Sequence, residues 1–258
     1  MNKPEIVPDR LSNPLNPAII IAILGIGLAI FAIMQFLPEE DVGIMAFSLS
    51  IIFSAGVAVA AFIVSKQNET GVLRKAYLFL GFGFTSYVVA ELLYYSFELF
   101  FDIEPYPSVA DIFFFALYPL TLGHLLLNIR FFHSEYTKFQ KVWIPSIPII
   151  AIIIYVTISL GVPEAEIGFD FFYGLIFVSG AAVTLSFTIV GASTFKQGTL
   201  GIIWLLLVLG LMFNAAGDIW YYHLEIFGEY FDAHPVTTVW YVANMFIIYA
   251  LVKHLKTI

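Results

Sequence analysis

Two stretches of the chain place acidic and tyrosine side chains at a spacing that would suit a binding site. Each has an acid, two tyrosines and a second acid at positions i, i+3, i+4 and i+7. On an α-helix this spacing gathers four side chains on one face, which rises about 10 Å from first to last. Two such faces opposite each other would line an acidic, aromatic pocket for a cation, a polyhydroxyl ligand or a metal. The eight residues are Glu91, Tyr94, Tyr95, Glu98, Asp218, Tyr221, Tyr222 and Glu225.

The helices that carry these residues are expected to cross a membrane. Of the 258 residues, 60% are hydrophobic and 12% are charged, whereas soluble domains carry about 25% charged residues. Eight apolar runs approach or exceed the roughly 20 residues that span the hydrocarbon of a bilayer. We therefore predict an all-α integral membrane protein with eight transmembrane helices in a lipid bilayer. The runs are Pro17–Leu37, Val42–Ser65, Leu73–Phe101, Ser108–Phe132, Val142–Val162, Ile167–Ala192, Thr199–Gly228 and Pro235–Leu255.

The basic residues indicate the direction in which these helices are threaded. If the N-terminus lies in the cytoplasm, every Lys and Arg falls on the cytoplasmic side, and the opposite loops hold acids only. Basic residues are enriched in cytoplasmic loops of membrane proteins. We therefore predict a multi-pass protein of the cell membrane, with both termini cytoplasmic and an acidic outer face for a small-molecule or cation ligand. The eleven basic residues are Lys3, Arg10, Lys66, Arg74, Lys75, Arg130, Lys138, Lys141, Lys196, Lys253 and Lys256.

The two tyrosine-rich stretches belong to a longer internal repeat. Gly83–Phe100 aligns with Gly210–Phe227 at a constant offset of 127 residues, which places Glu91 opposite Asp218. Four spans separate the copies, so both copies run in the same direction across the membrane. We expect two parallel four-helix repeats, residues 1–132 and residues 133–258, which together form one membrane domain.

Glu91 and Asp218 lie two turns deeper in the membrane than Glu98 and Glu225. An ionised carboxylate near the membrane middle costs roughly 2.5–3.5 kcal/mol on insertion scales, so it must face a cavity or a partner. One interpretation is a functional pocket. The other is that both acids are protonated and hydrogen-bond tyrosines or backbone across helices, which would hold the bundle together. For Glu98 and Glu225, near the interface, solvation is the simpler interpretation.

Other polar residues have structural interpretations. Ser108 and Asp111 have the spacing of a helix capping box, which we favour over a ligand role for Asp111. His124 lies in the middle of an apolar span and is expected to find one hydrogen-bond partner. Asn214 and Asn244 are expected to hydrogen-bond between helices. The histidines expected to lie in water at the cytoplasmic side are His133 and His254.

A metal site is a weaker hypothesis. Glu91, Asp218 and His223 offer oxygen and nitrogen ligands, but the chain has no HxxxH or HExxH spacing and no cysteine. The GxSxG and P-loop motifs are also absent, and the loops are too short for a nucleic-acid-binding domain. We therefore expect a protein that is not an enzyme and does not bind nucleic acid; the sequence identifies no cofactor.

Within Glu91–Leu122, an acid with aromatics is followed by a Pro-Tyr-Pro-Ser-x-x-Asp segment and an aromatic-Pro pair. This stretch resembles the N-terminal multi-span sensor region of bacterial membrane diguanylate cyclases and histidine kinases. The resemblance implies an orphan signal-input module. No output domain follows Ile258, so it further implies a stand-alone module that acts through a cytoplasmic signalling partner. The residues that carry the resemblance are Glu91, Tyr94, Pro105, Tyr106, Pro107, Ser108, Asp111, Tyr118 and Pro119, with Gly217, Asp218, Tyr221 and Trp240 in the second half.

Three functions fit these observations. The first is a sensor whose outer pocket binds a small ligand and whose helix shifts are read by a partner in the cytoplasm. The second is a proton- or cation-coupled transporter that uses Glu91 and Asp218 as its ion sites. The third is a metal-dependent membrane enzyme built on Glu91, Asp218 and His223.

Overall fold

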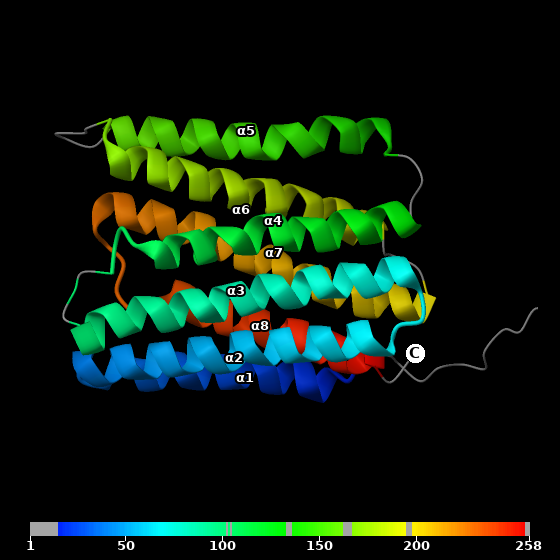
Figure 1. The fold of residues 1–258 in the computed structure, drawn as a ribbon, viewed down its shortest axis with the longest axis horizontal. Coiled ribbons are helices and arrows are strands. Elements are labelled where there is room, and N and C mark those ends of the chain that lie inside the picture. Colours follow the sequence, from blue (N-terminus) through cyan, green and yellow to red (C-terminus); the bar gives the residue numbers. More distant parts are fainter. Residues whose placement is uncertain are drawn as a thin grey trace, which may run out of the picture.

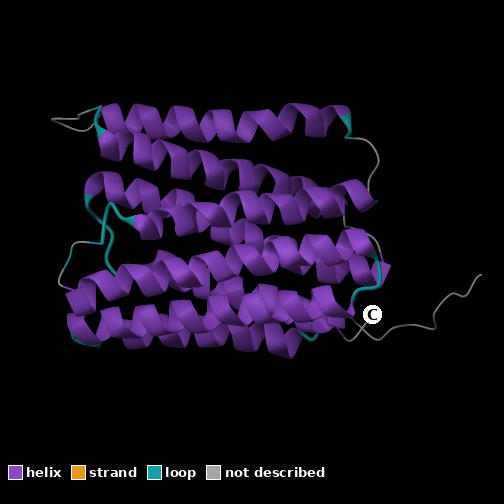
Figure 2. Cartoon of the chain, in the orientation of Figure 1, coloured by secondary structure: helices purple, strands orange, loops and turns teal. Residues whose placement is uncertain are grey.

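The computed structural model describes residues 15–101, 103, 105–132, 136–161, 167–194 and 198–255, without the side chains of 98–100 and 198–200. Every regular element in these ranges is an α-helix (Figure 2). Each of the eight helices is long and apolar enough to cross a membrane, which confirms the predicted fold class. The helices are α1 (Pro17–Met34), α2 (Glu39–Gln67), α3 (Gly71–Phe101), α4 (Val109–Phe132), α5 (Lys138–Gly161), α6 (Phe169–Thr194), α7 (Gly198–Phe227) and α8 (Pro235–Leu255).

The helix boundaries follow local capping chemistry. α1 begins after Asn16, whose side chain accepts a hydrogen bond from the backbone of Ala18, and Pro17 occupies its first position. The predicted start of the second span, Val42, was too late, because α2 already begins at Glu39. Three acids form its first turn, where the partial positive charge of the helix N-terminus favours them.

Six of the described helices form a closed ring. Going round it, each helix packs against the next in the order α2, α3, α4, α6, α7, α8 and back to α2. α1 packs on the outside against α8, and α5 on the outside against α6. Figure 1 shows α5 and α1 at opposite edges of the bundle. In this ring, α3 and α7 lie opposite each other, which is the arrangement needed for their two acidic faces to meet.

The neighbours around the ring are those that a two-fold relation between repeats would produce. Packing of α2 on α3 and of α3 on α4 recurs as α6 on α7 and α7 on α8. The two junctions between repeats, α2 with α8 and α6 with α4, also correspond. The outer helices depart from this relation. Because α1 packs against α8, its counterpart α5 would pack against α4, but it packs against α6 instead. The division at residues 132 and 133 stays a prediction.

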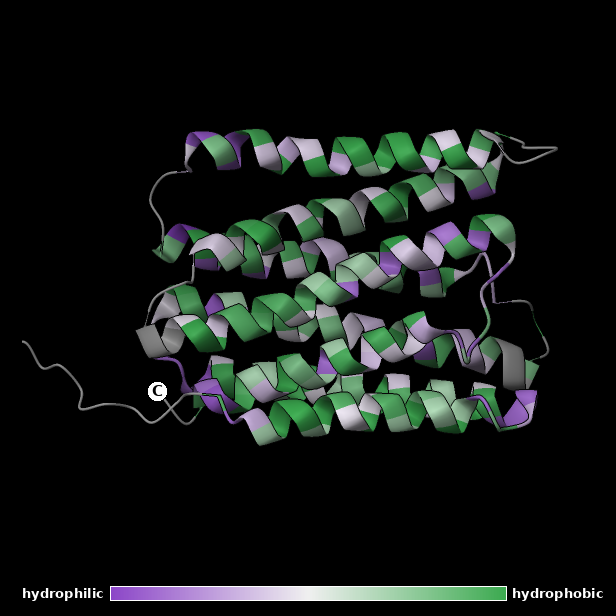
Figure 3. Ribbon diagram, turned by 180° about the vertical axis from the view of Figure 1, so that it is seen from behind, coloured by the Kyte–Doolittle hydropathy of each residue, from purple (hydrophilic) through white to green (hydrophobic). Residues whose placement is uncertain are grey.

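The two ends of the bundle differ in charge. Successive helices run in opposite directions (Figure 1), so alternate loops lie at the same end. We call the end that holds residues 35–38, 105–108 and 228–234 the acidic end, and the opposite end the basic end. Hydrophobic residues dominate the helices between these two ends (Figure 3). Every described Lys or Arg lies at the basic end: Lys66, Arg74, Lys75, Arg130, Lys138, Lys141 and Lys253. The other four, Lys3, Arg10, Lys196 and Lys256, lie outside the described residues.

Tightly packed side chains fill the half of the ring toward the basic end. Tyr77, Leu80, Leu125 and Ile129 are all less than 2% exposed, and the surrounding core draws on α2, α3, α4, α7 and α8. The other half holds two smaller buried clusters, one formed by α1, α2 and α8 and one by α4 to α7, beside the cavity described below.

Two histidines belong to this packed half. The His124 ring nitrogen Nδ1 lies 2.9 Å from the carbonyl oxygen of Ala76, so the ring has the hydrogen-bond partner expected for it, and Asn128 Nδ2 lies 3.3 Å from both ring nitrogens as well. The expectation that His254 lies in water was wrong, because the residue is 4% exposed. Its ring packs 5.3 Å from Tyr77 and 5.7 Å from Trp204, centroid to centroid. The sequence shows that His254 lies near the end of α8, but it does not show that this side of the helix faces α3 and α7. His133 lies outside the described residues.

The orientation can be tested directly because the chain contains no cysteine. Single cysteines at the exposed positions Glu40 and Glu229, at the acidic end, should react with a membrane-impermeant maleimide on intact cells. Cysteines at Lys66 and Lys141, exposed at the basic end, should react only after permeabilisation. Labelling of Lys66→Cys on intact cells would contradict the predicted cytoplasmic position of both termini.

Candidate functional site

A cavity of 790 Å³ lies in the half of the bundle toward the acidic end. Its walls come from α3 to α8 and from the two loops that precede α4 and α8. Seven of the eight residues predicted from the helical spacing line it, and the side chain of the eighth, Glu98, lies outside the described part of the chain. The seven are Glu91, Tyr94, Tyr95, Asp218, Tyr221, Tyr222 and Glu225.

The cavity wall combines many phenol rings with uncompensated carboxyl groups. Ten tyrosines and six acids line it, and no Lys, Arg or His is among its lining residues. Only Glu91 among these acids is buried, and Asp170 and Glu225 are exposed; a buried carboxylate is normally paired with a base or a metal ion. A cation inside the cavity would supply that charge, and tyrosine faces attract cations through their ring quadrupole. The acids are Glu91, Asp111, Asp170, Asp218, Glu225 and Asp232.

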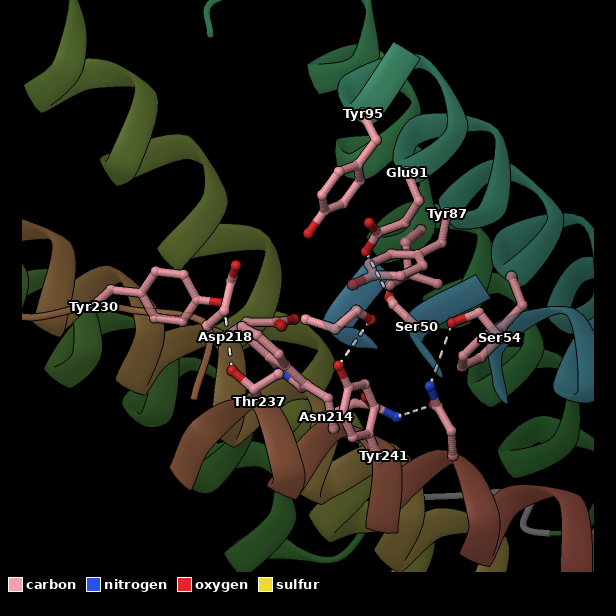
Figure 4. A pocket seen from close by; sticks show the side chains of 16 residues that line it. Ser50, Ser54, Tyr87, Glu91, Tyr95, Asn214, Asp218, Tyr230, Thr237 and Tyr241 are labelled. Atoms are coloured by element: carbon pink, nitrogen blue, oxygen red, sulfur yellow. Dashed lines mark hydrogen bonds between the residues drawn. The ribbon is translucent and has the colours of Figure 1, made fainter. Parts of the chain in front are cut away.

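A smaller chamber of 60 Å³ adjoins this cavity and shares Glu91 and Asp218 with it (Figure 4). Glu91 is 8% exposed, and the Ser50 hydroxyl donates a 2.6 Å hydrogen bond to its Oε1 atom. Ser50 comes from α2, so the acid is anchored between two helices. The chamber has room for about two water molecules by volume. In Figure 4 the Tyr87 and Tyr95 rings lie on either side of Glu91.

An amide network closes the floor of the chamber. Asn214 Nδ2 donates to Asn244 Oδ1 at 3.0 Å, and Asn244 Nδ2 donates to Ser54 Oγ at 3.4 Å. These bonds link α7, α8 and α2, and they confirm the expected role of both asparagines between helices. The Tyr241 hydroxyl adds a 2.9 Å bond to the carbonyl oxygen of Ala46. The floor is therefore fixed by hydrogen bonds rather than by apolar packing.

Asp218 faces the Tyr118 hydroxyl of α4 and the Trp240 indole of α8. The Trp240 ring nitrogen Nε1 is buried, and no described atom accepts a hydrogen bond from it at bonding distance. The indole fits here because position 217 is glycine: a Cβ atom there would lie 2.6 Å from Nε1. The Tyr118 ring similarly packs on Gly180, where a Cβ atom would lie 2.8 Å from the ring.

A second group of acids and tyrosines lies nearer the acidic end. Asp111 Oδ2 accepts from the backbone nitrogen of Ser108 at 2.6 Å, which confirms the capping box. Its other oxygen, Oδ1, accepts from the Tyr173 hydroxyl at 2.8 Å. Beside it, the Tyr106 hydroxyl donates to Asp170 at 2.7 Å, and the rings of Tyr106 and Tyr173 lie 4.8 Å apart. Asp111 is thus both a helix cap and part of the cavity wall.

Asp232, on the loop before α8, borders both cavities. Burial raises the pKa of this carboxyl above its usual range; a hydrogen bond from Tyr230 lowers it in part, and the nearby charge of Glu39 raises it further. Glu91 and Tyr95 of α3 also face this acid. Asp232 therefore adds a carboxyl from the loop at the acidic end to the wall of both cavities.

The proposed metal ligands do not come together. His223 is exposed, its ring lies 5.2 Å from Phe227, and it is not part of the cavity wall with Glu91 and Asp218. Among the described residues no three His, Cys, Asp or Glu form a group that could hold a metal ion. Glu225 lines the cavity but is exposed, in keeping with the solvation expected for it.

Several lining residues were missed in the sequence. Tyr87 lies one turn before Glu91 on the same face of α3, and at the offset of 127 it aligns with Asn214; both line the small chamber. Both positions lie inside the aligned repeat, and continuing the helical spacing one turn before Glu91 would have found this pair. Tyr118, Asp170 and Tyr173 had no such signal, because their role depends on which faces of α4 and α6 turn inward.

Comparisons with known proteins add no family to this description. No protein-family model, curated protein or solved structure matches the chain. The fold and the cavity define the chain as an eight-helix membrane protein with an acidic, tyrosine-lined cavity.

The fit of Trp240 on Gly217 predicts a specific effect of Gly217→Ala. The added methyl group must push the rigid indole toward Asp218, and such overpacking costs about 1–3 kcal/mol. The apparent Tm of the detergent-solubilised protein should therefore fall. Gly25→Ala is the matched control, since a Cβ atom there meets nothing within 4 Å, and its Tm should stay or rise. Equal effects of the two changes would contradict this packing.

The raised pKa of Asp232 predicts a pH-dependent stability. A folded state with a raised carboxyl pKa holds its proton more tightly than the unfolded state, so ionisation destabilises it as the pH rises from about 4, the ordinary pKa of the carboxyl, through the raised pKa of the folded state. Asp232→Asn should therefore gain apparent Tm relative to wild type across this range. Glu229→Gln, an exposed acid on the same loop, should follow wild type at every pH. A constant difference between Asp232→Asn and wild type would contradict the assignment.

Proposed function

We propose that this protein is a membrane sensor that binds a small organic cation in the cavity at its acidic end. The observation that carries the proposal is the cavity wall: ten tyrosines and six carboxyl groups without a basic side chain. A volume of 790 Å³ is in the range of small-molecule sites, which usually measure about 300–1,000 Å³.

Charge favours a cation over the other ligands that an acidic, aromatic pocket would suit. A polyhydroxyl ligand would hydrogen-bond the carboxylates but leave their charge uncompensated within the bundle. An anion would be repelled. A metal ion would need grouped ligands, and the described residues provide no such group. An organic cation would be matched by both carboxylates and aromatic faces, as in known quaternary-ammonium sites.

The packing supports binding with a signal rather than passage through the bundle. The helices that carry Glu91, Asp218 and Trp240 continue into the core toward the basic end. There the same three helices contribute Tyr77, Trp204 and His254 to one aromatic cluster. A ligand that draws α3 and α7 together would therefore shift packed elements at the basic end, where we propose that a signalling partner binds. The resemblance to bacterial sensor regions fits this proposal.

The binding proposal predicts discrimination between a cation and its neutral isostere. Choline should bind the purified protein in calorimetry, whereas 3,3-dimethyl-1-butanol, which has the same shape without the charge, should not. Glu91→Gln and Asp218→Asn should each weaken choline binding about tenfold or more, because each removes a negative charge that attracts the cation inside the bundle. Glu229→Gln removes an exposed charge at the same end without touching the cavity wall, and should leave binding unchanged. Equal binding of the alcohol and choline would refute the proposal.

Flux measurements separate the sensor from the transporter. Proteoliposomes that contain the protein should bind labelled choline without accumulating it, because side chains fill the half toward the basic end. Accumulation that Glu91→Gln abolishes would instead establish the transporter.

A further inference from the structure

We infer that the ligand is a linear diamine or polyamine whose two ends bind at separate carboxylate–tyrosine clusters, one deep in the cavity and one nearer the acidic end. This inference rests on the proposed binding of an organic cation and specifies its class. It depends on two pairs among the acids of the cavity wall, Glu91 with Asp218 and Asp111 with Asp170, and on the apolar residues that lie between them on α4.

The deep cluster is built around Glu91 and Asp218. Ser50 holds Glu91 from α2, while Tyr118 and Trp240 face Asp218 from α4 and α8. Both acids line the cavity from opposite sides of the ring, and carboxyl oxygens are the acceptors that the three donors of a primary ammonium group require.

The second cluster is built around Asp111 and Asp170, from α4 and α6. Each accepts a tyrosine hydroxyl, Asp111 from Tyr173 and Asp170 from Tyr106. The edge-to-face contact of these two tyrosine rings holds both acids in place. Both acids and both tyrosines line the same cavity as the deep cluster. An ammonium group here would meet two carboxylates and the face of a phenol ring.

Helix geometry sets the distance between the clusters. Asp111 belongs to the second cluster, and Tyr118, seven residues later on α4, reaches the deep one. Seven residues of α-helix correspond to a rise of about 10 Å. The cavity wall on α4 between these two residues includes Phe114 and Leu117, and Phe177 of α6 lines the same cavity. An apolar wall of this length fits the methylene chain of an extended diamine with an ammonium group at each end.

Three ligands of one length test the inference: 1,8-diaminooctane with two charges, 8-amino-1-octanol with one, and 1,8-octanediol with none. Competition against labelled diamine on the purified protein should rank them in that order. The diamine should bind at least tenfold more tightly than the amino alcohol. Shorter diamines, such as 1,4-diaminobutane, should lose this advantage because they cannot reach both clusters.

Substitutions in each cluster test which cluster binds which end of the ligand. Asp170→Asn should weaken binding of the diamine at least fivefold and leave the amino alcohol unchanged, since a single ammonium group occupies the deep cluster. Glu91→Gln should weaken both ligands. Tyr173→Phe, which removes only the hydroxyl that holds Asp111, should reproduce the Asp170→Asn pattern more weakly, and Glu229→Gln should change neither ligand.

The outcomes distinguish this inference from the proposal beneath it. If the diamine and the amino alcohol bind equally well, and both bind better than the diol, the two-cluster inference is wrong and cation binding stands. If neither cation binds better than the diol, both are wrong. An equal loss of both ligands in Asp170→Asn would also overturn the assignment of the second cluster.

Discussion

The structure depends on one constraint: carboxyl groups inside an apolar helical bundle need partners, and this bundle offers them no base. Glu91 and Asp218 lie on opposite helices of the ring, and all the described Lys and Arg lie at the basic end. Their partners are hydroxyls, an indole and a hollow space. A solid apolar core around them would leave buried charge without compensation. The cavity is therefore the condition under which these acids can occupy the bundle.

Helical periodicity explains how much of this site the sequence could predict. Spacing alone places Glu91, Tyr94 and Tyr95 on one face, and the repeat places their counterparts on a second helix; the structure brings both faces to one cavity. The predicted direction of each helix across the membrane rests on the absence of basic residues from alternate loops. Both arguments use properties within one helix or one loop, which do not depend on how helices pack.

What the sequence did not reveal depends on contacts between helices. Asp111 has the spacing of a helix cap, and that interpretation is correct, but nothing in its neighbourhood shows that Tyr173 of α6 reaches its second oxygen. His254 lies in the last turn of α8, and its burial follows from the position of Tyr77 and Trp204. In both cases the deciding partner lies more than 45 residues away in the chain.

The contrast between the two halves of the ring follows from side-chain size. Toward the basic end, α2 offers Val57, Ala58 and Ala61, and α8 offers Ala250, all buried small residues that let helix backbones approach closely. Toward the acidic end, α3 and α7 present tyrosines and acids instead, which hold the helices apart and leave polar atoms around the hollow. Closing that hollow needs a group that satisfies those atoms, and a cation does so while packing against the rings. The same helices are tightly packed at the other end, so under the proposed function their approach around a ligand would displace packed side chains at the basic end.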